Sequence, residues 1–450
     1  MNPPRVLIAG TCSGSGKTTA TCVVLTLLKR RGVKVNSCKC GPDYIDPMFH
    51  AAVLGVPCAN LDPFFCDKAL LRHLLKENAG EDLTVIEGVM GYYDGTGATG
   101  TENSTFTVAN ETGTPVILTV DGRGAAASLL AVIEGFLRFQ PDSGVKGVLF
   151  NRIKPHTYQS VCTMMRARFG AEVTPVGYIP EFPEEYRIPS RHLGLVTAGE
   201  IAGLTEKINA VADLCENTVD TDKIISIAQT AEEITDEAPE IPALPPVNIA
   251  VAKDAAFCFY YADTLRLLEK TGATLLPFSP LANEPVPRSA DGLLLGGGYP
   301  ELYAERLAAN EITKESVRCA VANGMPTVAE CGGFQYLGKT LDGKAMCGVL
   351  RHESTNAGIL TRFGYVTLTA QRDGLLGPAG TALRGHEFHY WDSTENGDGF
   401  IAEKPGGKSW PCVVYTPTLY AGYPHLFLYA GISAAEAFYR KCLAYKEKKL

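Results

Sequence analysis

The sequence predicts an α/β protein with two doubly wound domains, each built on a mostly parallel sheet. In the first half, short apolar runs alternate with longer amphipathic segments, which is typical of strands joined by helices. The alternation stops at residues 230–246, where acidic residues and prolines dominate, and it restarts at residue 247. A chain of 450 residues is also too long for one ordinary core. We therefore predict domains at residues 1–229 and 247–450, joined by a linker at 230–246.

The elements of each domain follow from their hydrophobic pattern. In the first domain, apolar runs predict strands, and an amphipathic run predicts a helix at 18–31; the strands are 6–9, 33–39, 84–87, 115–120 and 145–150. In the second domain the same patterns predict a helix at 262–271 and strands at 247–252, 274–277, 292–295 and 326–329. Alternating strands and helices favour βαβ units in both halves.

Composition excludes several classes of function. Apolar residues make up 46% and charged residues 20%, as in a soluble globular protein. We see neither a bilayer-spanning apolar run nor a signal peptide, so we expect a cytoplasmic protein without a membrane partner. The net charge of −8 and the lack of a long basic run argue against nucleic acid. The 14 cysteines form no Cys-x-x-Cys pair, so most should be reduced and buried.

Residues 10–19 contain a phosphate-binding loop between a predicted strand and a predicted helix. The ending Gly-Lys-Thr at a helix start is the P-loop signature. The spacing departs from the standard pattern, because five residues rather than four lie between Gly10 and Gly16. Glycines let backbone N–H groups turn toward phosphate, while the lysine meets the terminal phosphates and the following hydroxyl can bind Mg²⁺. The alternative is a glycine-rich turn without a ligand. The predicted ATP-binding residues are Gly14, Gly16, Lys17, Thr18 and Thr19.

Acidic residues follow two other predicted strands. Asp43 and Asp46 lie after the second strand, and Glu87 ends the next confident one. Ligands gather beyond the carboxyl ends of strands in such sheets, and carboxylates there can hold Mg²⁺ against phosphates. Aspartates in a proline-containing turn often only form the turn, so that alternative stays open for Asp43 and Asp46. Glu87, at the end of a buried strand beside glycines, is the stronger candidate.

The second domain contains a candidate nucleophile at Cys331. It lies between a predicted strand and a predicted helix and precedes small residues, as in a nucleophile elbow. The alternative is an ordinary buried cysteine. A thiolate that attacks an amide also needs a base and hydrogen-bond donors to the oxyanion. Gly296, Gly297 and Gly298 follow a predicted strand and offer backbone N–H groups as these donors, and the alternative is a glycine-rich turn without a ligand. Spacing alone does not identify the base among eight histidines, and His386 and His389 lack the helical spacing of a zinc site.

These segments together resemble known amide-forming enzymes. The long P-loop resembles that of dethiobiotin synthetase and its amidoligase relatives. Residues 41–47 (Gly-Pro-Asp-Tyr-Ile-Asp-Pro), 87–95 and 191–195 (Arg-His-Leu-Gly-Leu) resemble the cobyrinic acid a,c-diamide synthase family, and the resemblance extends over essentially the whole chain. It implies a P-loop NTPase-like domain followed by a class I glutamine amidotransferase-like domain.

The resemblance also implies roles for individual residues. Thr18, Asp43 and Glu87 would bind Mg²⁺, Lys39 phosphate and Asn151 the adenine. Tyr44 and Asp46 would face the tetrapyrrole carboxylates or the phosphorylated intermediate. The other residues expected to contact substrates are Asp43 for the tetrapyrrole and Gly297, Gly298 and Gln335 for glutamine. Cys331 would be the nucleophile and His425 its activating base. Typical class I domains have a glutamate two residues after that histidine, where this chain has Phe427. The residue that orients His425 is therefore not evident, and Glu330, beside Cys331, is not accepted as a substitute.

The expected activity is ATP- and glutamine-dependent amidation of the a- and c-acetates of cobyrinic acid, through an acyl phosphate and ammonia from L-glutamine, in cobalamin biosynthesis. Hydrogenobyrinic acid and nickel-sirohydrochlorin are alternative tetrapyrrole substrates that the sequence does not separate. The alternative from another class is a P-loop switch ATPase with an inert second domain. The sequence leaves open the oligomeric state, the ammonia path and the order of the two amidations.

Overall fold

The structure, a computed structural model, describes residues 3–97, 100–187, 198–235 and 238–449. The chain divides into two compact units, Met1–Pro239 and Glu240–Leu450. The division falls inside the segment predicted as a linker. Part of that prediction, Asp236 and Glu237, lies outside the described residues, as does the family-like segment 191–195.

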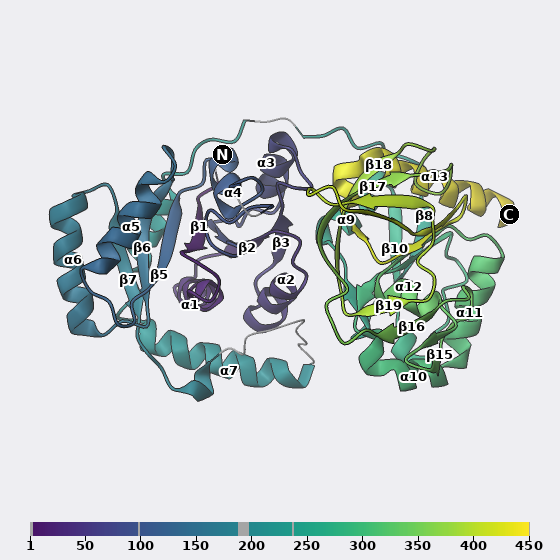
Figure 1. Cartoon of the computed structure of the whole chain (residues 1–450), viewed down its shortest axis with the longest axis horizontal. Helices are drawn as coiled ribbons and strands as arrows, with labels where there is room; N and C mark the ends of the chain where they lie inside the picture. Colours follow the sequence, from purple (N-terminus) through teal and green to yellow (C-terminus); the bar gives the residue numbers. More distant parts are fainter. Residues whose placement is uncertain (1–2, 98–99, 188–197, 236–237, 450) are drawn as a thin grey trace. The chain divides into compact units, whose positions relative to one another are not determined.

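A seven-stranded sheet with every neighbouring pair parallel forms the centre of the first unit (Figure 1). Its strand order is β3-β2-β4-β1-β5-β6-β7. The strands are β1 (Arg5–Gly10), β2 (Val35–Cys40), β3 (Cys58–Leu61), β4 (Leu83–Glu87), β5 (Val116–Asp121), β6 (Val145–Asn151) and β7 (Thr174–Ile179). Every residue of β1 and β4 is buried, as expected of strands covered on both faces.

Helices pack against this sheet, and one shared core shows how. Apolar residues of β1 and β4 form a single buried cluster with Val24 and Leu28 of α1, Val211 of α7 and Ile224 of α8. The helices of the unit are α1 (Lys17–Arg30), α2 (Ile45–Phe49), α3 (Lys68–Glu77), α4 (Thr105–Thr112), α5 (Ser128–Arg138), α6 (Pro155–Phe169), α7 (Ala198–Cys215) and α8 (Thr221–Ala228). The apolar face of α1 thus fixes the helix that starts at the P-loop against the sheet.

The second unit is centred on a six-stranded sheet in the order β10-β8-β11-β13-β23-β22. All its neighbouring pairs are parallel except β22 with β23. These strands are β8 (Val247–Ala252), β10 (Ala273–Phe278), β11 (Gly292–Leu295), β13 (Thr327–Glu330), β22 (Val414–Thr416) and β23 (Leu419–Gly422). The helices are α9 (Ala262–Thr271), α10 (Ala304–Ala309), α11 (Glu311–Ala322), α12 (Gly332–Leu337) and α13 (Ile432–Lys449). The predicted fold class of two mostly parallel α/β units is confirmed.

The second unit also carries smaller sheets that the sequence patterns did not predict, and their strand pairs are antiparallel except β14 with β16. A five-stranded sheet has the order β21-β20-β17-β18-β24, a four-stranded sheet the order β15-β14-β16-β19, and β9 pairs with β12. These strands are β9 (Phe257–Phe259), β12 (Gly297–Gly298), β14 (Thr340–Leu341), β15 (Lys344–Ala345), β16 (Glu353–Asn356), β17 (Arg362–Ala370), β18 (Ala382–His389), β19 (Trp391–Ser393), β20 (Phe400–Glu403), β21 (Ser409–Cys412) and β24 (His425–Leu426). The five-stranded sheet positions His425, which lies on its edge strand β24 and pairs with His386.

Among the helices of the described residues, none combines the length and apolar character required to cross a bilayer.

Candidate active sites

The P-loop connects β1 to α1 and depends on glycines at two positions. Gly14 has φ 78° and Gly16 has φ 101°, which are left-handed values that side chains disfavour. A Cβ on Gly16 would also lie 2.0 Å from Asn151 Nδ2. The Asn151 amide donates a hydrogen bond to the Ser15 carbonyl at 2.9 Å, so the end of β6 contacts the loop directly.

Two lysines concentrate positive charge beside this loop. Lys17, at the start of α1, is buried, and its ammonium donates to the Cys12 carbonyl at 3.1 Å. Burial, and then the nearby Lys39 ammonium, lowers the pKa of Lys17 to about 8. Lys39 has carboxylate partners of its own, but the surroundings of Lys17 still disfavour its ammonium, so a further anion beside Lys17 would be stabilising. The arrangement therefore favours a polyanion at the helix start, where backbone N–H groups also point outward.

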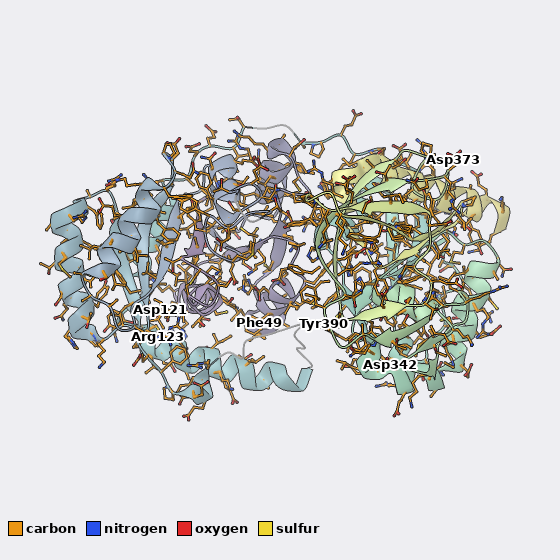
Figure 2. All side chains as sticks on the ribbon, in the orientation of Figure 1. Phe49, Asp121, Arg123, Asp342, Asp373 and Tyr390 are labelled. Atoms are coloured by element: carbon orange, nitrogen blue, oxygen red, sulfur yellow. The ribbon has the colours of Figure 1, made fainter. Side chains whose placement is uncertain are left out.

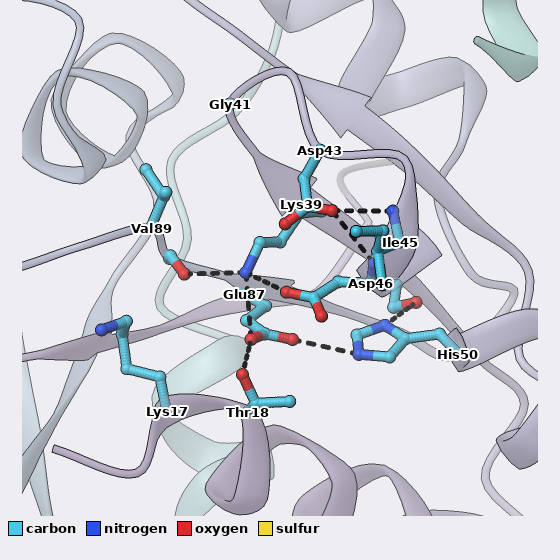
Figure 3. Close-up of polar contacts among 12 residues, drawn as sticks. Lys17, Thr18, Lys39, Gly41, Asp43, Ile45, Asp46, His50, Glu87 and Val89 are labelled. Carbon is cyan, nitrogen blue, oxygen red and sulfur yellow. Dashed lines mark hydrogen bonds and ion pairs between the residues drawn. The ribbon is translucent and has the colours of Figure 1, made fainter. Parts of the chain in front are cut away.

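Glu87 is the centre of a buried polar network (Figure 3). Its Oε1 lies 3.0 Å from Lys39 Nζ and accepts the Thr18 hydroxyl hydrogen bond at 2.6 Å. Its Oε2 lies 3.0 Å from His50 Nε2. Burial alone would raise the pKa of Glu87, but Lys39 and His50 outweigh it and hold the pKa well below the ordinary value. Glu87 is thus an anion directly beside the hydroxyl of the P-loop threonine.

The two aspartates of the acidic segment after β2 make different contacts. Asp43 Oδ1 accepts the backbone N–H groups of Ile45 at 2.8 Å and Asp46 at 3.1 Å, so this side chain shapes the start of α2. Asp46 instead forms an ion pair with Lys39 at 2.5 Å. Burial, together with Glu87 and Asp43, raises the pKa of Asp46 to about 6 despite that lysine. Tyr44 precedes α2 and is partly buried.

Sequence reasoning missed His50. It is fully buried at the start of a π-helical turn, His50–Leu54, and its Nδ1 lies 3.0 Å from the Ser37 hydroxyl. Burial would lower its pKa, but hydrogen bonds to Cys22, Cys58 and Glu87 outweigh this and raise it well above the ordinary value. A signal was present, because His50 follows Asp46 by four residues and so lies on the same face of a helical segment.

A divalent cation fits this network only with help from other ligands. No group of three or more His, Cys, Asp or Glu side chains suited to a metal occurs in the described ranges. Mg²⁺ usually binds one or two carboxylates and completes its shell with phosphates and water. The Thr18 hydroxyl and the Glu87 carboxylate, in contact at 2.6 Å, match that donor set. Asp43 lies near enough to Lys39 to act on its charge, and its role as a metal ligand stays a prediction.

Two further side chains bracket the P-loop at the ends of β5 and β6. Arg152 has φ 56° and donates to the Gly14 carbonyl at 2.9 Å and to Asp121 at 2.7 Å. Asp121 also pairs with Arg123 at 2.9 Å, and Figure 2 labels both. Thr19 lies in the first turn of α1. The adenine-binding role of Asn151 stays a prediction. Its neighbour Arg152 contacts the same P-loop through the Gly14 carbonyl.

Cys331 occupies an elbow between β13 and α12. Its backbone has φ 49° and ψ −102°, which is rare for a residue with a side chain. The two following glycines are needed for close packing: a Cβ on Gly332 would lie 2.9 Å from Pro300 Cδ, and one on Gly333 would lie 2.0 Å from the Leu295 carbonyl. A helix N-terminus behind a cysteine favours its thiolate.

His425 lies beside this elbow and is buried. Its Nδ1 is 3.5 Å from Glu330 Oε2. Burial would lower its pKa, but the Cys331 thiol and the Glu330 carboxylate outweigh this and raise it to about 10. Sequence reasoning had set Glu330 aside, whereas the structure brings its carboxylate to the ring of His425. Phe427 packs its ring against Tyr261 at a centroid distance of 5.1 Å.

The other predicted glutamine-site residues surround the same elbow. A Cβ on Gly297 would lie 2.4 Å from His425 Cε1, and the Gly298 nitrogen lies 3.3 Å from where a Cβ on Gly332 would be. Gln335 is buried, and its side chain bonds Tyr423. The two glycines therefore lie beside the candidate thiol–imidazole pair, while Gln335 lies in α12, the helix that follows Cys331.

Two further histidines, His386 and His389, lie on β18. Burial lowers the pKa of His386 to about 3, so it stays neutral. His389 Nδ1 is 2.6 Å from the Trp391 carbonyl, and its ring stacks on Tyr423 at 3.8 Å. Three positions apart on a strand, His386 and His389 project to opposite faces. They do not form a shared metal site.

Comparison with known proteins gives a consistent result for both units. Residues 6–196 match the CobQ/CobB/MinD/ParA nucleotide binding domain family, and residues 248–430 match the CobB/CobQ-like glutamine amidotransferase domain family. A cobyrinate a,c-diamide synthase of Listeria monocytogenes is 40% identical over 442 residues, covering 95% of this chain and 97% of that protein. The Priestia megaterium protein of the same name is 35% identical over 467 residues, covering 100% and 99%. That of Gloeobacter violaceus is 40% identical over 455 residues, covering 98% and 97%.

Proposed function

The chain belongs to the cobyrinate a,c-diamide synthase family, and from that premise we propose that it uses ATP and glutamine to convert the a- and c-acetate carboxylates of cobyrinic acid to amides. It is a glutamine-dependent ligase with a nucleotide-binding domain. The observation that supports the proposal best is the presence, in one chain, of a cationic P-loop site and a thiol on an elbow beside a histidine.

The first unit activates the carboxylate in this proposal. Lys17 and Lys39 bind the terminal phosphates of ATP, and the acetate attacks the γ-phosphorus to give an acyl phosphate and ADP. The Thr18 hydroxyl and the Glu87 carboxylate would hold Mg²⁺, which would supply positive charge to neutralise the phosphates. Asp46 is paired with Lys39, and Tyr44 directly precedes α2. In this proposal the two side chains orient the tetrapyrrole carboxylic acid. Ammonia then attacks the acyl carbon and phosphate leaves.

The second unit supplies the ammonia. The Cys331 thiolate attacks the amide carbon of glutamine, and backbone N–H groups near Gly298 and Gly332 stabilise the oxyanion. His425 gives its proton to the leaving nitrogen, the C–N bond breaks, and a thioester remains. Water, with His425 as base, hydrolyses the thioester to glutamate and restores the thiol. Because free ammonia is mostly protonated and unreactive near neutral pH, fusing the two activities in one chain favours a protected transfer of ammonia.

The test compares nitrogen sources in the full-length chain. Wild type, Cys331→Ala and a matched control, Cys347→Ala, receive ATP, Mg²⁺, cobyrinic acid and either glutamine or ammonium. Cys347 is another fully buried thiol of the same unit. Cys331→Ala should form amide from ammonium alone, while Cys347→Ala should use both sources. Amide formed from glutamine by Cys331→Ala, measured by mass spectrometry, would contradict the assignment.

The substrate is tested separately. Cobyrinic acid, hydrogenobyrinic acid and nickel-sirohydrochlorin are offered side by side, and kcat/KM is measured for each. The names of the relatives support cobyrinic acid. A higher kcat/KM for either of the other acids would replace cobyrinic acid in the proposal and leave the amidation chemistry intact.

A further inference from the structure

The strand pairing of the second unit brings Glu330 to His425. β13 and β23 are parallel neighbours, with Glu330 in register with Gly422. The chain turns after β23 and returns as β24, which begins at His425. The last residue of β13 therefore lies beside the first residue of β24, although 94 residues separate them in sequence. Cys331 follows at once on the elbow.

Both oxygens of Glu330 face the histidine segment. Oε1 accepts the backbone N–H of Leu426 at 3.1 Å, and Oε2 lies 3.5 Å from His425 Nδ1. The first contact fixes the carboxylate against the strand that carries the ring, and the second directs its charge to one ring nitrogen. Catalytic hydrogen bonds are often long without substrate and shorten during reaction, so 3.5 Å is within working range.

We propose that Glu330 is the positioning residue of His425, holding its Nδ1 side so that Nε2 serves the Cys331 thiol. This inference rests on the proposed glutamine hydrolysis. It assigns the third position of the triad to the residue before the nucleophile, since Phe427, two residues after the histidine, has no hydrogen-bonding side chain. A carboxylate at Nδ1 selects the tautomer and stabilises the imidazolium that forms when the thiol loses its proton.

The charged and titratable groups that face His425 come from three elements. Glu330 comes from β13, Cys331 from the start of α12, and His386 from β18. His386 stays neutral because burial lowers its pKa to about 3. Glu330 therefore supplies a negative charge next to the His425 ring, and this charge does not come from the nucleophile.

The experiment measures glutamine hydrolysis against pH for wild type, Glu330→Gln, Glu330→Asp and Glu387→Gln, all as the full chain. Glu387 is the matched control, because it is a buried carboxylate of the same unit that lies 3.5 Å from a different histidine, His389. Glu330→Gln should lower kcat at least about 100-fold with little change in KM. Losing the carboxylate lowers the pKa of the imidazolium, so the alkaline limb of kcat should move to lower pH. Glu330→Asp should recover part of the rate, and Glu387→Gln should keep the wild-type profile.

Two results would overturn the inference. One is a Glu330→Gln enzyme with wild-type kcat, and the other is a reduced kcat whose alkaline limb has not moved, as a purely structural role would produce. If Glu330→Gln does not fold, Glu330→Asp provides the test. Its shorter side chain moves the carboxylate away from His425, which lowers the pKa of the imidazolium and should also move the alkaline limb of kcat to lower pH. Amidation from ammonium reports on the first unit throughout. Wild type without any glutaminase activity would instead contradict the proposed function.

Discussion

The ammonium of Lys39 lies 3.0 Å from the carboxylate of Glu87, and both side chains are almost completely removed from solvent. Two buried charges of opposite sign persist only when each has further partners, because desolvation is costly for both. Asp46 provides a second partner for Lys39, and Thr18 and His50 provide partners for Glu87. This network places one anion and one cation at the point where the terminal phosphates of a nucleotide on the P-loop are expected.

Replacing Glu87 by Gln should abolish most ATP turnover. The change leaves the shape nearly intact but removes the charge that faces Lys39, His50 and the proposed Mg²⁺. We expect at least about a 100-fold loss in substrate-dependent ADP release and a higher Mg²⁺ requirement. Glutamine hydrolysis by the second unit is the internal control and should persist. ADP release at the wild-type rate would remove Glu87 from the catalytic network.

Replacing Lys17 by Ala should have a comparable effect on ATP turnover, because the change removes the buried ammonium that contacts the P-loop at the start of α1. A suitable control is Lys29→Ala, since Lys29 lies in the same helix and bonds the Leu54 carbonyl at its other end. We expect at least about a 100-fold loss for Lys17→Ala and near-normal turnover for Lys29→Ala. Undiminished ADP release by the Lys17 variant would refute the P-loop assignment.

Gly297→Ala should disable glutamine use selectively. The added methyl carbon would lie 2.4 Å from His425 Cε1, so the ring has to move. Misplacing a catalytic group by about 1 Å typically costs about 100-fold in rate. Gly406→Ala is the control, because a Cβ there meets no atom within 4 Å. Amidation should be measured with glutamine and with ammonium, and only the glutamine-dependent rate of Gly297→Ala should fall. Equal loss with both nitrogen sources would mean that the change damages more than the thiol site.

The second unit should lose stability in mild acid partly through His352. Burial lowers the pKa of His352 to about 4, so between its ordinary pKa of 6.5 and that value the unfolded chain binds a proton that the folded chain does not. The free energy of unfolding therefore decreases as pH falls through this window. From pH 7 to pH 5, wild type should lose about 2 kcal/mol more than His352→Gln. His386 acts in the same direction and His425 in the opposite one, but both are present in each protein.

This measurement can follow the second unit alone. The chain has 2 tryptophans, Trp391 and Trp410, and both lie in the second unit. Urea unfolding followed by tryptophan fluorescence at the two pH values gives the required free energies. Parallel pH dependences for wild type and His352→Gln would show that His352 does not carry this effect.

Sequence patterns predicted most of the parallel strands, because their signal is local, but they missed β3, β7 and β23. β4, for example, is a fully buried, mostly apolar segment that ends in Glu87, and β8 agrees with its predicted bounds at both ends. The P-loop was predicted for the same reason, since its glycines, lysine and threonine are contiguous. The antiparallel strands escaped notice because many are only two to four residues long, such as β12 and β24, and they are defined by partners rather than by their own residues.

The candidate sites show the same limit. Lys39, Asp46 and Glu87 could be inferred as neighbours because each lies at the carboxyl end of a strand or just after it. The contact between Glu330 and His425 could not, because it requires β13 to pair with β23 and the chain then to turn into β24. His50 was missed because its spacing of four residues from Asp46 gained a chemical meaning only once Glu87 was placed opposite it.

The backbone of Cys331 has a further consequence for the energetics of the whole protein. Its φ of 49° and ψ of −102° are close to the mirror image of an extended conformation, which glycine adopts freely and cysteine does not. Strain of this kind costs about 1–3 kcal/mol and is held by the surrounding fold. The nucleophile thus lowers the stability of the unit that it serves, and a Cys331→Gly chain should resist heat better than the active enzyme. Function and stability are therefore opposed at this position.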